Sequence, residues 1–142
     1  MTRYDVLVVD DEQEFCEAIV KHLSKKDLYC EMAHDGDTAL DMIQNKRYDV
    51  VLLDVKMPGR DGIETLREIK RITPMVEVVM LTGHASIEAG VNGIKFGAFD
   101  YLRKPIEIAA LVERLDAAYD RKRIQQEKIE SAQIKKDMSM PG

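Results

Sequence analysis

The sequence predicts an α/β fold in which helices cover both faces of a five-stranded parallel sheet. Two short runs without any polar residue, at residues 6–9 and 50–53, are typical of strands that are buried on both faces. Carboxylates follow both runs immediately, at Asp10, Asp11 and Asp54. Strand patterns and helix patterns alternate five times along the chain, which is typical of a doubly wound sheet.

The first part of the chain carries two strands and two helices. The first strand is expected at residues 4–9, and apolar residues at helical spacing mark one face of a helix over residues 15–23. A shorter strand is expected at residues 28–33. The Asp-Gly-Asp turn at residues 35–37 has N-cap chemistry, so a second helix should follow with its apolar stripe over residues 39–43.

The middle of the chain repeats this pattern. The third strand is expected at residues 50–53, and the helix after it has an apolar side chain at every third position from Ile63 to Ile72. Pro74 ends this helix, because proline has no N–H to continue the hydrogen-bond ladder. The fourth strand is expected at residues 76–81, where Glu77 is the one charged residue.

The last repeat has a weaker helix and a shorter strand. Residues 86–95 predict a helix of low intrinsic stability, because two glycines lie inside it. The fifth strand is expected at residues 98–102. Pro105 fits the first turn of a final helix, whose core face runs over residues 108–115.

The five strands fit the flavodoxin-like order 2-1-3-4-5, with helices in a layer on each side of the sheet. In this order the first and third strands are neighbours, so Asp10, Asp11 and Asp54 emerge together at the edge where open α/β sheets bind ligands. Three carboxylates in one place repel each other. A hard cation that prefers oxygen ligands relieves this repulsion, so the sequence predicts a Mg²⁺ site.

Two further polar residues are expected at the same edge of the sheet. Thr82 follows the fourth strand and Lys104 follows the fifth, and both strands lie on the side of Asp54. A lysine ammonium neutralises phosphoryl oxygens as a point charge, and a threonine hydroxyl donates a hydrogen bond to one of them. With a carboxylate as acceptor and Mg²⁺ beside it, this set of groups is suited to phosphoryl transfer.

The composition is that of an ordinary soluble domain. The 142 residues suffice for one core, and 45% of them are hydrophobic and 33% charged. No segment approaches the roughly 20 apolar residues that span a bilayer. The N-terminus leads directly into a strand, without the apolar core of a secretory signal. Cys16 and Cys30 lack metal-ligand spacing and are expected to be buried thiols, so we expect a cytoplasmic location.

Charge divides the chain near residue 120. Residues 1–120 hold 15 Lys and Arg against 23 Asp and Glu, whereas residues 121–142 hold 6 against 3. The acidic body does not suggest direct binding of nucleic acid. The basic tail is expected to extend the last helix to about Asp137 and to fray over residues 138–142. Its isoleucines recur every five residues, which fits no coiled-coil period, so at most a weak homodimer contact is expected.

Five short motifs resemble those of a known family. They are Asp10-Asp11, the run from Asp54 to Gly59, Asp61-Gly62, Thr82-Gly83 and Lys104-Pro105. In this order they resemble the receiver domain of two-component response regulators. The stretch at residues 97–105 is most similar to receivers of the nitrogen-regulation type. The expected organisation is therefore a receiver domain at residues 1–120 and a helical extension at residues 121–142.

The resemblance implies a phosphoacceptor and a metal site. Asp54 resembles the aspartate that accepts the phosphoryl group. Asp10 and Asp11 resemble the acid pair that binds Mg²⁺, one of them through water, and the backbone carbonyl of Lys56 resembles a further ligand of the ion. As a member of such a family the chain would catalyse only its own aspartyl phosphorylation and dephosphorylation, and would not be an enzyme acting on other molecules.

The resemblance also implies a switch and two kinds of partner. Thr82 and Lys104 resemble the pair that binds the phosphoryl group, and Tyr101 resembles the aromatic residue that reorients with Thr82. The implied function is a phosphorelay, in which a sensor histidine kinase or a phosphotransfer protein phosphorylates the receiver. The receiver then binds a downstream protein through the surface of its fourth helix and fifth strand.

Other classes of protein remain as alternatives. A receiver-like scaffold that works without phosphorylation would normally have lost one of the site carboxylates or the lysine. This chain has both the carboxylates and Lys104. An aspartate-nucleophile phosphatase commonly has a second Asp two residues after its nucleophile, where this chain has Lys56. A flavin site fails because Asp11 and Glu12 would repel a phosphate. The chain as a receiver fragment of a longer regulator is the last alternative.

Overall fold

A single parallel sheet organises the part of the chain that the computed structural model describes, residues 3–83 and 86–139. The strands are ordered β2-β1-β3-β4-β5, as the sequence predicts. Their bounds are Asp5–Val9 for β1, Tyr29–Ala33 for β2, Val50–Leu53 for β3, Glu77–Thr82 for β4 and Asp100–Arg103 for β5. All four neighbouring pairs are parallel, so their carboxyl ends share one edge of the sheet.

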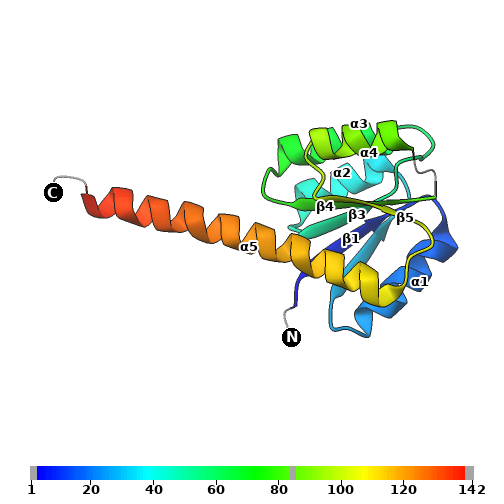
Figure 1. The fold of residues 1–142 in the computed structure, drawn as a ribbon, viewed down its shortest axis with the longest axis horizontal. Coiled ribbons are helices and arrows are strands. Elements are labelled where there is room, and N and C mark those ends of the chain that lie inside the picture. The colour runs from blue at the N-terminus through cyan, green and yellow to red at the C-terminus, as the bar shows by residue number, and fades with distance from the viewer. Residues whose placement is uncertain (1–2, 84–85, 140–142) are drawn as a thin grey trace.

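Helices form a layer on each face of the sheet (Figure 1). On one face lie α1 (Gln13–Ser24) and α5 (Ile108–Ser139), and on the other lie α2 (Gly36–Asn45), α3 (Gly62–Ile72) and α4 (Ile87–Lys95). Alternate residues of the apolar strands point to the two faces. The side chains therefore form two cores, one for each helix layer, and β1, β3 and β4 are buried from both sides.

Polar side chains start three of the helices. Asp35, Asp61 and Ser86 are the N-caps of α2, α3 and α4, and each accepts a hydrogen bond from a backbone N–H of the first turn, at 2.7, 2.9 and 3.0 Å. These bonds satisfy donors that have no partner inside a helix. The prediction that residues 35–37 cap a helix is confirmed at Asp35.

The start of α5 differs from the sequence prediction. Pro105 does not lie in the first turn of the final helix, because α5 begins three residues later, at Ile108. The backbone N–H of Lys104 donates to the carbonyl of Thr82 at 2.8 Å, so the chain stays extended beside β4 up to this residue. The Lys104–Pro105 peptide bond is cis, and the first helical bond runs from Leu111 N–H to the carbonyl of Glu107.

Helix α5 is one helix of 32 residues that projects beyond the sheet (Figure 1). Leu111, Leu115 and Ala118 pack into the core, whereas Ile129 and the other apolar residues of the projecting part are exposed. Fraying was expected from residue 138, but the helix continues to Ser139, and residues 140–142 lie outside the described part of the chain. Neither α5 nor another helix in the described ranges is long and apolar enough to cross a membrane.

A buried charge lies at the other end of the sheet, away from the acidic edge. Glu77, the first residue of β4, is 3% exposed. Lys70 of α3 places its Nζ 3.6 Å from the carboxylate, and Arg121 of α5 places its Nε 3.4 Å from it. Lys70 also donates to the carbonyls of Pro74 and Val76, at 2.9 and 2.7 Å. These contacts join both helix layers to the amino end of β4.

We expect Lys70→Met to lower the free energy of unfolding by roughly 2 kcal/mol, because it leaves the Glu77 carboxylate buried with one cation at the rim. Urea unfolding at pH 7, followed by far-ultraviolet circular dichroism, measures this loss. The double variant Lys70→Met/Glu77→Gln should recover part of it, since the unpaired charge is gone while the hydrogen bonds to the carbonyls of Pro74 and Val76 stay lost. A double variant less stable than Lys70→Met would show that the ion pair does not explain the loss.

Candidate functional site

The sheet register brings the two central carboxylates together. Val9 of β1 pairs with Leu53 of β3, and Asp10 and Asp54 are the next residue of each strand. The N–H of Asp54 donates to the carbonyl of Val9 at 2.9 Å, so the ends of β1 and β3 stay side by side where the two acids follow them. Both acids are almost fully buried, Asp10 with 2% and Asp54 with 3% exposure. The convergence expected from the strand order is therefore present.

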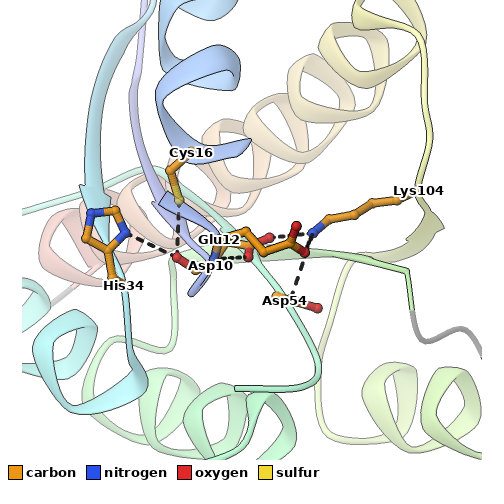
Figure 2. A network of polar contacts seen from close by, with 6 residues as sticks. All are labelled: Asp10, Glu12, Cys16, His34, Asp54 and Lys104. Atoms are coloured by element: carbon orange, nitrogen blue, oxygen red, sulfur yellow. Dashed lines mark hydrogen bonds and ion pairs between the residues drawn. The ribbon is translucent and has the colours of Figure 1, made fainter. Parts of the chain in front are cut away.

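The hydroxyl and the ammonium predicted for this edge are also present. Thr82 is the last residue of β4 and is fully buried. Lys104 follows β5, and its Nζ lies 2.6 Å from Oδ2 of Asp10 and 3.9 Å from Oδ2 of Asp54 (Figure 2). Four of the predicted site residues thus form one cluster, with one cation between two buried carboxylates.

The electrostatics of the cluster leave the phosphoacceptor candidate poorly compensated. Burial, and then the negative charge of Asp10, raise the pKa of Asp54, while a hydrogen bond with Thr82 and the charge of Lys104 act in the opposite direction. Burial lowers the pKa of Lys104. Its hydrogen bond with Asp10 and the surrounding carboxylates outweigh burial, so the pKa of Lys104 is raised above its usual value. Within residues 3–83 and 86–139, Oδ1 of Asp54 is buried and accepts no hydrogen bond. A buried oxygen of this kind is suited to a cation.

Three carboxylates are close enough to share a metal ion. Oxygens of Asp10, Glu12 and Asp54 all lie within 4.8 Å of one another. Glu12 was not expected from the sequence, although its position directly after the acid pair was a signal. Asp11 is exposed and is not one of these three, but it lines a pocket of about 420 Å³ together with Glu12, Asp54 and Lys56. The oxygen donors fit Mg²⁺, and the roles of Asp11 and of the Lys56 carbonyl stay predictions.

Contacts from two other elements hold the backbone of Asp10. The thiol of Cys16 in α1 donates to the carbonyl of Asp10 at 3.3 Å, and Nδ1 of His34 lies 3.2 Å from the same oxygen (Figure 2). Cys16 is fully buried and burial raises its pKa to about 12, so it is a structural thiol, whereas Cys30 is half-buried. Neither the Cys16 contact nor the His34 contact was expected from the sequence.

The backbone after Asp54 is packed against the start of α3. The N–H of Gly62 donates to the carbonyl of Val55 at 2.7 Å. A Cβ atom on Gly62 would lie 2.2 Å from the carbonyl oxygen of Asp54 and 2.6 Å from Cα of Val55. Only a glycine therefore permits this approach, and the approach places the Asp54 carboxylate at the edge of the sheet.

Tyr101 lies to one side of the acidic cluster. It is half-buried in β5, and its hydroxyl accepts a hydrogen bond from the N–H of Ser86 at 3.3 Å. A Cβ atom on Gly90 would lie 3.1 Å from its ring, so α4 packs closely over Tyr101. Ile87 and Val91 of α4 are 87% and 59% exposed, and both line an open pocket of about 960 Å³ between α4 and β5.

The chain matches one protein family over most of its length. Residues 6–116 match the response regulator receiver domain. The transcriptional regulatory protein ZraR of Salmonella typhimurium is 38% identical over 116 residues, which are 82% of this chain and 26% of that protein. The DNA-binding transcriptional regulator NtrC of Escherichia coli K12 is 38% identical over 122 residues, or 84% and 26%. The chain thus spans about a quarter of the length of these relatives.

Solved structures agree with this assignment. A CheY-like receiver domain protein from Methanospirillum hungatei superposes with a TM-score of 0.84 at 27% identity, over 87% of this chain and 99% of that one. NtrX from Brucella abortus, in complex with ADP, superposes with a TM-score of 0.85 at 31% identity, over 99% of this chain and 31% of that one. With the acidic cluster at the carboxyl edge of a 2-1-3-4-5 sheet, the chain belongs to the response regulator receiver family, with an NtrC-like receiver.

Proposed function

We propose that this chain is a phosphorylation-dependent receiver, which accepts a phosphoryl group on Asp54 from the phosphohistidine of a kinase or phosphotransfer protein. The observation that carries the proposal is the setting of the Asp54 carboxylate. It is buried beside Asp10, its Oδ1 accepts no hydrogen bond within the described part of the chain, and Lys104 lies 3.9 Å from Oδ2. An electrophile or cation that reaches this oxygen relieves an unfavourable arrangement.

The proposed transfer exchanges one bond to phosphorus for another. A carboxylate oxygen of Asp54 forms the new P–O bond while the P–N bond of the phosphohistidine breaks, and the imidazole keeps the electron pair and takes a proton from water. Lys104 supplies a positive charge for the phosphoryl oxygens, and the Thr82 hydroxyl donates a hydrogen bond to one of them. Thr82 ends β4 and Lys104 follows β5, and Nζ of Lys104 already lies 3.9 Å from the Asp54 carboxylate, so its charge is near the site before the transfer begins.

Carboxylates of the same cluster would hold Mg²⁺. Asp10, Asp54 and Glu12 offer oxygens within 4.8 Å of one another, and Asp11 and the Lys56 carbonyl are the further ligands predicted from the sequence. When bound, the ion supplies charge neutralisation for phosphoryl oxygens. The buried oxygen of Asp54 without a hydrogen bond and the hard oxygen donors both fit this ion.

The surface of α4 and β5 would pass on the signal. The hydroxyl of Tyr101 bonds to the N-cap of α4, and Thr82 ends the neighbouring strand. On phosphorylation Thr82 would move toward the phosphoryl group, and Tyr101 would turn inward. The exposed side chains of Ile87 and Val91 would then change position, which alters the apolar surface offered to a downstream protein.

These roles define the partners. The chain would catalyse only its own aspartyl phosphorylation and dephosphorylation, with a histidine kinase or phosphotransfer protein on one side and a downstream protein on the other. No contact with a membrane or with nucleic acid is proposed for this receiver itself. The exposed isoleucines of α5 would support a weak homodimer, and the cytoplasmic location stays a prediction.

The proposal is tested with Mg²⁺ and a small phosphodonor. We expect a single phosphoryl adduct in the intact mass after incubation with Mg²⁺ and acetyl phosphate, and none when EDTA removes the ion. With beryllofluoride as the mimic, hydrogen exchange should change in α4 and around Tyr101 but stay the same in α2. Size-exclusion chromatography with light scattering on the same samples measures whether α5 mediates a dimer.

The outcomes separate the parts of the proposal. An unchanged mass in the presence of Mg²⁺ would contradict the phosphoacceptor role and would favour a scaffold that works without phosphorylation. An adduct together with unchanged exchange in α4 would keep the chemistry and remove the switch.

A further inference from the structure

Four groups surround the ammonium of Lys104, and two of them come from the start of α1. Its Nζ lies 2.6 Å from Oδ2 of Asp10, 3.9 Å from Oδ2 of Asp54 and 3.4 Å from Oε1 of Glu12. On its remaining side it lies 4.0 Å from the centre of the Phe15 ring. The Lys104 side chain is 13% exposed, so this enclosure replaces most of its water.

We propose that Phe15 is a positioning residue for Lys104, and that its ring holds the ammonium at the mouth of the site where phosphoryl oxygens arrive. This inference rests on the proposed function. A lysine has a flexible four-carbon stem, so an ammonium held only by carboxylates could take several positions around them. The face of an aromatic ring attracts the same cation and blocks the way toward α1. The ring therefore limits Lys104 to positions between Asp10 and Asp54.

Glu12 supports this arrangement from the same helix end. It is the N-cap residue of α1, but its side chain makes no capping hydrogen bond and reaches Lys104 instead (Figure 2). Its backbone N–H donates to Oδ1 of Asp10 at 2.9 Å. Glu12 at the start of α1 thus contacts both members of the Lys104–Asp10 ion pair, through its carboxylate and its backbone N–H. Glu12 also belongs to the carboxylate cluster, so a change there alters metal binding as well.

Phe15 is the cleaner residue to test, because a phenyl ring cannot bind the metal ion. Phe15→Leu keeps an apolar side chain in the core and removes the ring, and Phe15→Tyr keeps the ring. Phe99 is a matched control, because it is half-buried in the same core and lies beside Arg114 at 5.4 Å instead of Lys104. The Phe99 ring also lies 5.8 Å from the guanidinium of Arg121. Phe99→Leu therefore reports what the loss of a half-buried ring and its cation contacts does away from Lys104.

The first readout is spectroscopic. Protons of the Lys104 ε-methylene next to the ring face should show an upfield ring-current shift in the wild type and in Phe15→Tyr. The shift should disappear in Phe15→Leu and persist in Phe99→Leu. Its absence in the wild-type protein would overturn the inference, because Lys104 would then not lie over the ring.

The second readout is the rate of phosphorylation by acetyl phosphate over a range of Mg²⁺ concentrations. In Phe15→Leu we expect a maximal rate about tenfold lower than in the wild type, with the Mg²⁺ concentration for half-maximal rate unchanged. Phe15→Tyr should restore the rate to within about twofold.

Three kinetic results would overturn the inference. They are a wild-type rate in Phe15→Leu, an equal loss in Phe15→Leu and Phe99→Leu, and a loss that saturating Mg²⁺ removes. A wild-type chain that forms no adduct at all would overturn the proposed function and this inference with it. That failure is distinguishable, because it appears in the wild-type arm before any variant is compared.

Discussion

Asp54→Asn should form no phosphoryl adduct and yet unfold at a higher urea concentration than the wild type. The carboxamide cannot accept the phosphoryl group as a carboxylate oxygen does, so the adduct disappears. The same change removes a charge that is buried beside Asp10 and only partly compensated by Lys104. We expect a gain of about 1 kcal/mol in the free energy of unfolding at pH 7 without Mg²⁺.

The pH dependence of stability has a definite sign at this residue. Burial and the negative charge of Asp10 raise the pKa of Asp54 above its ordinary value, so the folded state holds the proton more tightly than the unfolded state. The stability that Asp54 contributes is therefore largest below the unfolded pKa and is lost as the pH rises through the folded pKa. The gain in the free energy of unfolding from Asp54→Asn should be small in acid and should grow toward neutral pH.

Urea unfolding from pH 4 to 7, with and without Mg²⁺, measures this effect. Mg²⁺ should stabilise the wild type more than the variant, because it binds the folded site. Asp41→Asn, on the exposed face of α2, is the matched control and should keep both the adduct and the wild-type stability. A full adduct on Asp54→Asn, or a variant less stable than the wild type at pH 7, would contradict the assigned role of Asp54.

Gly62→Ala should be the most destabilising single methyl group that can be added near the site. Its Cβ would lie 2.2 Å from the carbonyl oxygen of Asp54 and 2.6 Å from Cα of Val55, and both are backbone atoms that cannot rotate away. We expect the free energy of unfolding to fall by about 3 kcal/mol. The loop must shift to relieve the contact, and a displaced Asp54 carboxylate should slow adduct formation by about 10²-fold.

Gly83→Ala is the matched control for this prediction. Among residues 3–83 and 86–139, no heavy atom would lie within 4 Å of a Cβ on Gly83, and the φ angle of Gly83 is not positive. We expect its free energy of unfolding to stay within about 0.5 kcal/mol of the wild type. Circular dichroism in urea and intact mass after acetyl phosphate treatment measure both variants. Equal stability of Gly62→Ala and Gly83→Ala would show that the loop yields without cost.

The arrangement of the sheet was accessible from the sequence because it depends on local patterns. The apolar runs at residues 6–9 and 50–53 are typical of central parallel strands, and the alternation with helices leaves few strand orders. Once the order is known, residues that follow the strands must share an edge. Asp10, Asp54 and Lys104 were therefore placed together correctly before any contact was known.

Expectations about single residues were weaker where a long-range bond overrides a local preference. Pro105 was expected in the first turn of the last helix, but the bond from Lys104 N–H to the carbonyl of Thr82 keeps the chain extended past β5. The helix of the tail runs to Ser139, beyond the residue where fraying was expected. At Pro105 and at the end of α5, the intrinsic conformational propensity contributes little free energy, and tertiary or helical hydrogen bonds contribute more.

The sequence by itself determined the fold, the edge that carries the chemistry and the residue types gathered there, because burial patterns and chain connectivity decide these. Only the tertiary structure decided how the side chains meet. It placed Glu12 with Asp10 and Asp54, set Cys16 and His34 against the Asp10 carbonyl, and laid the Phe15 ring beside Lys104. Such contacts depend on side-chain rotamers and on ångström-scale distances between elements, which no pattern along the chain encodes.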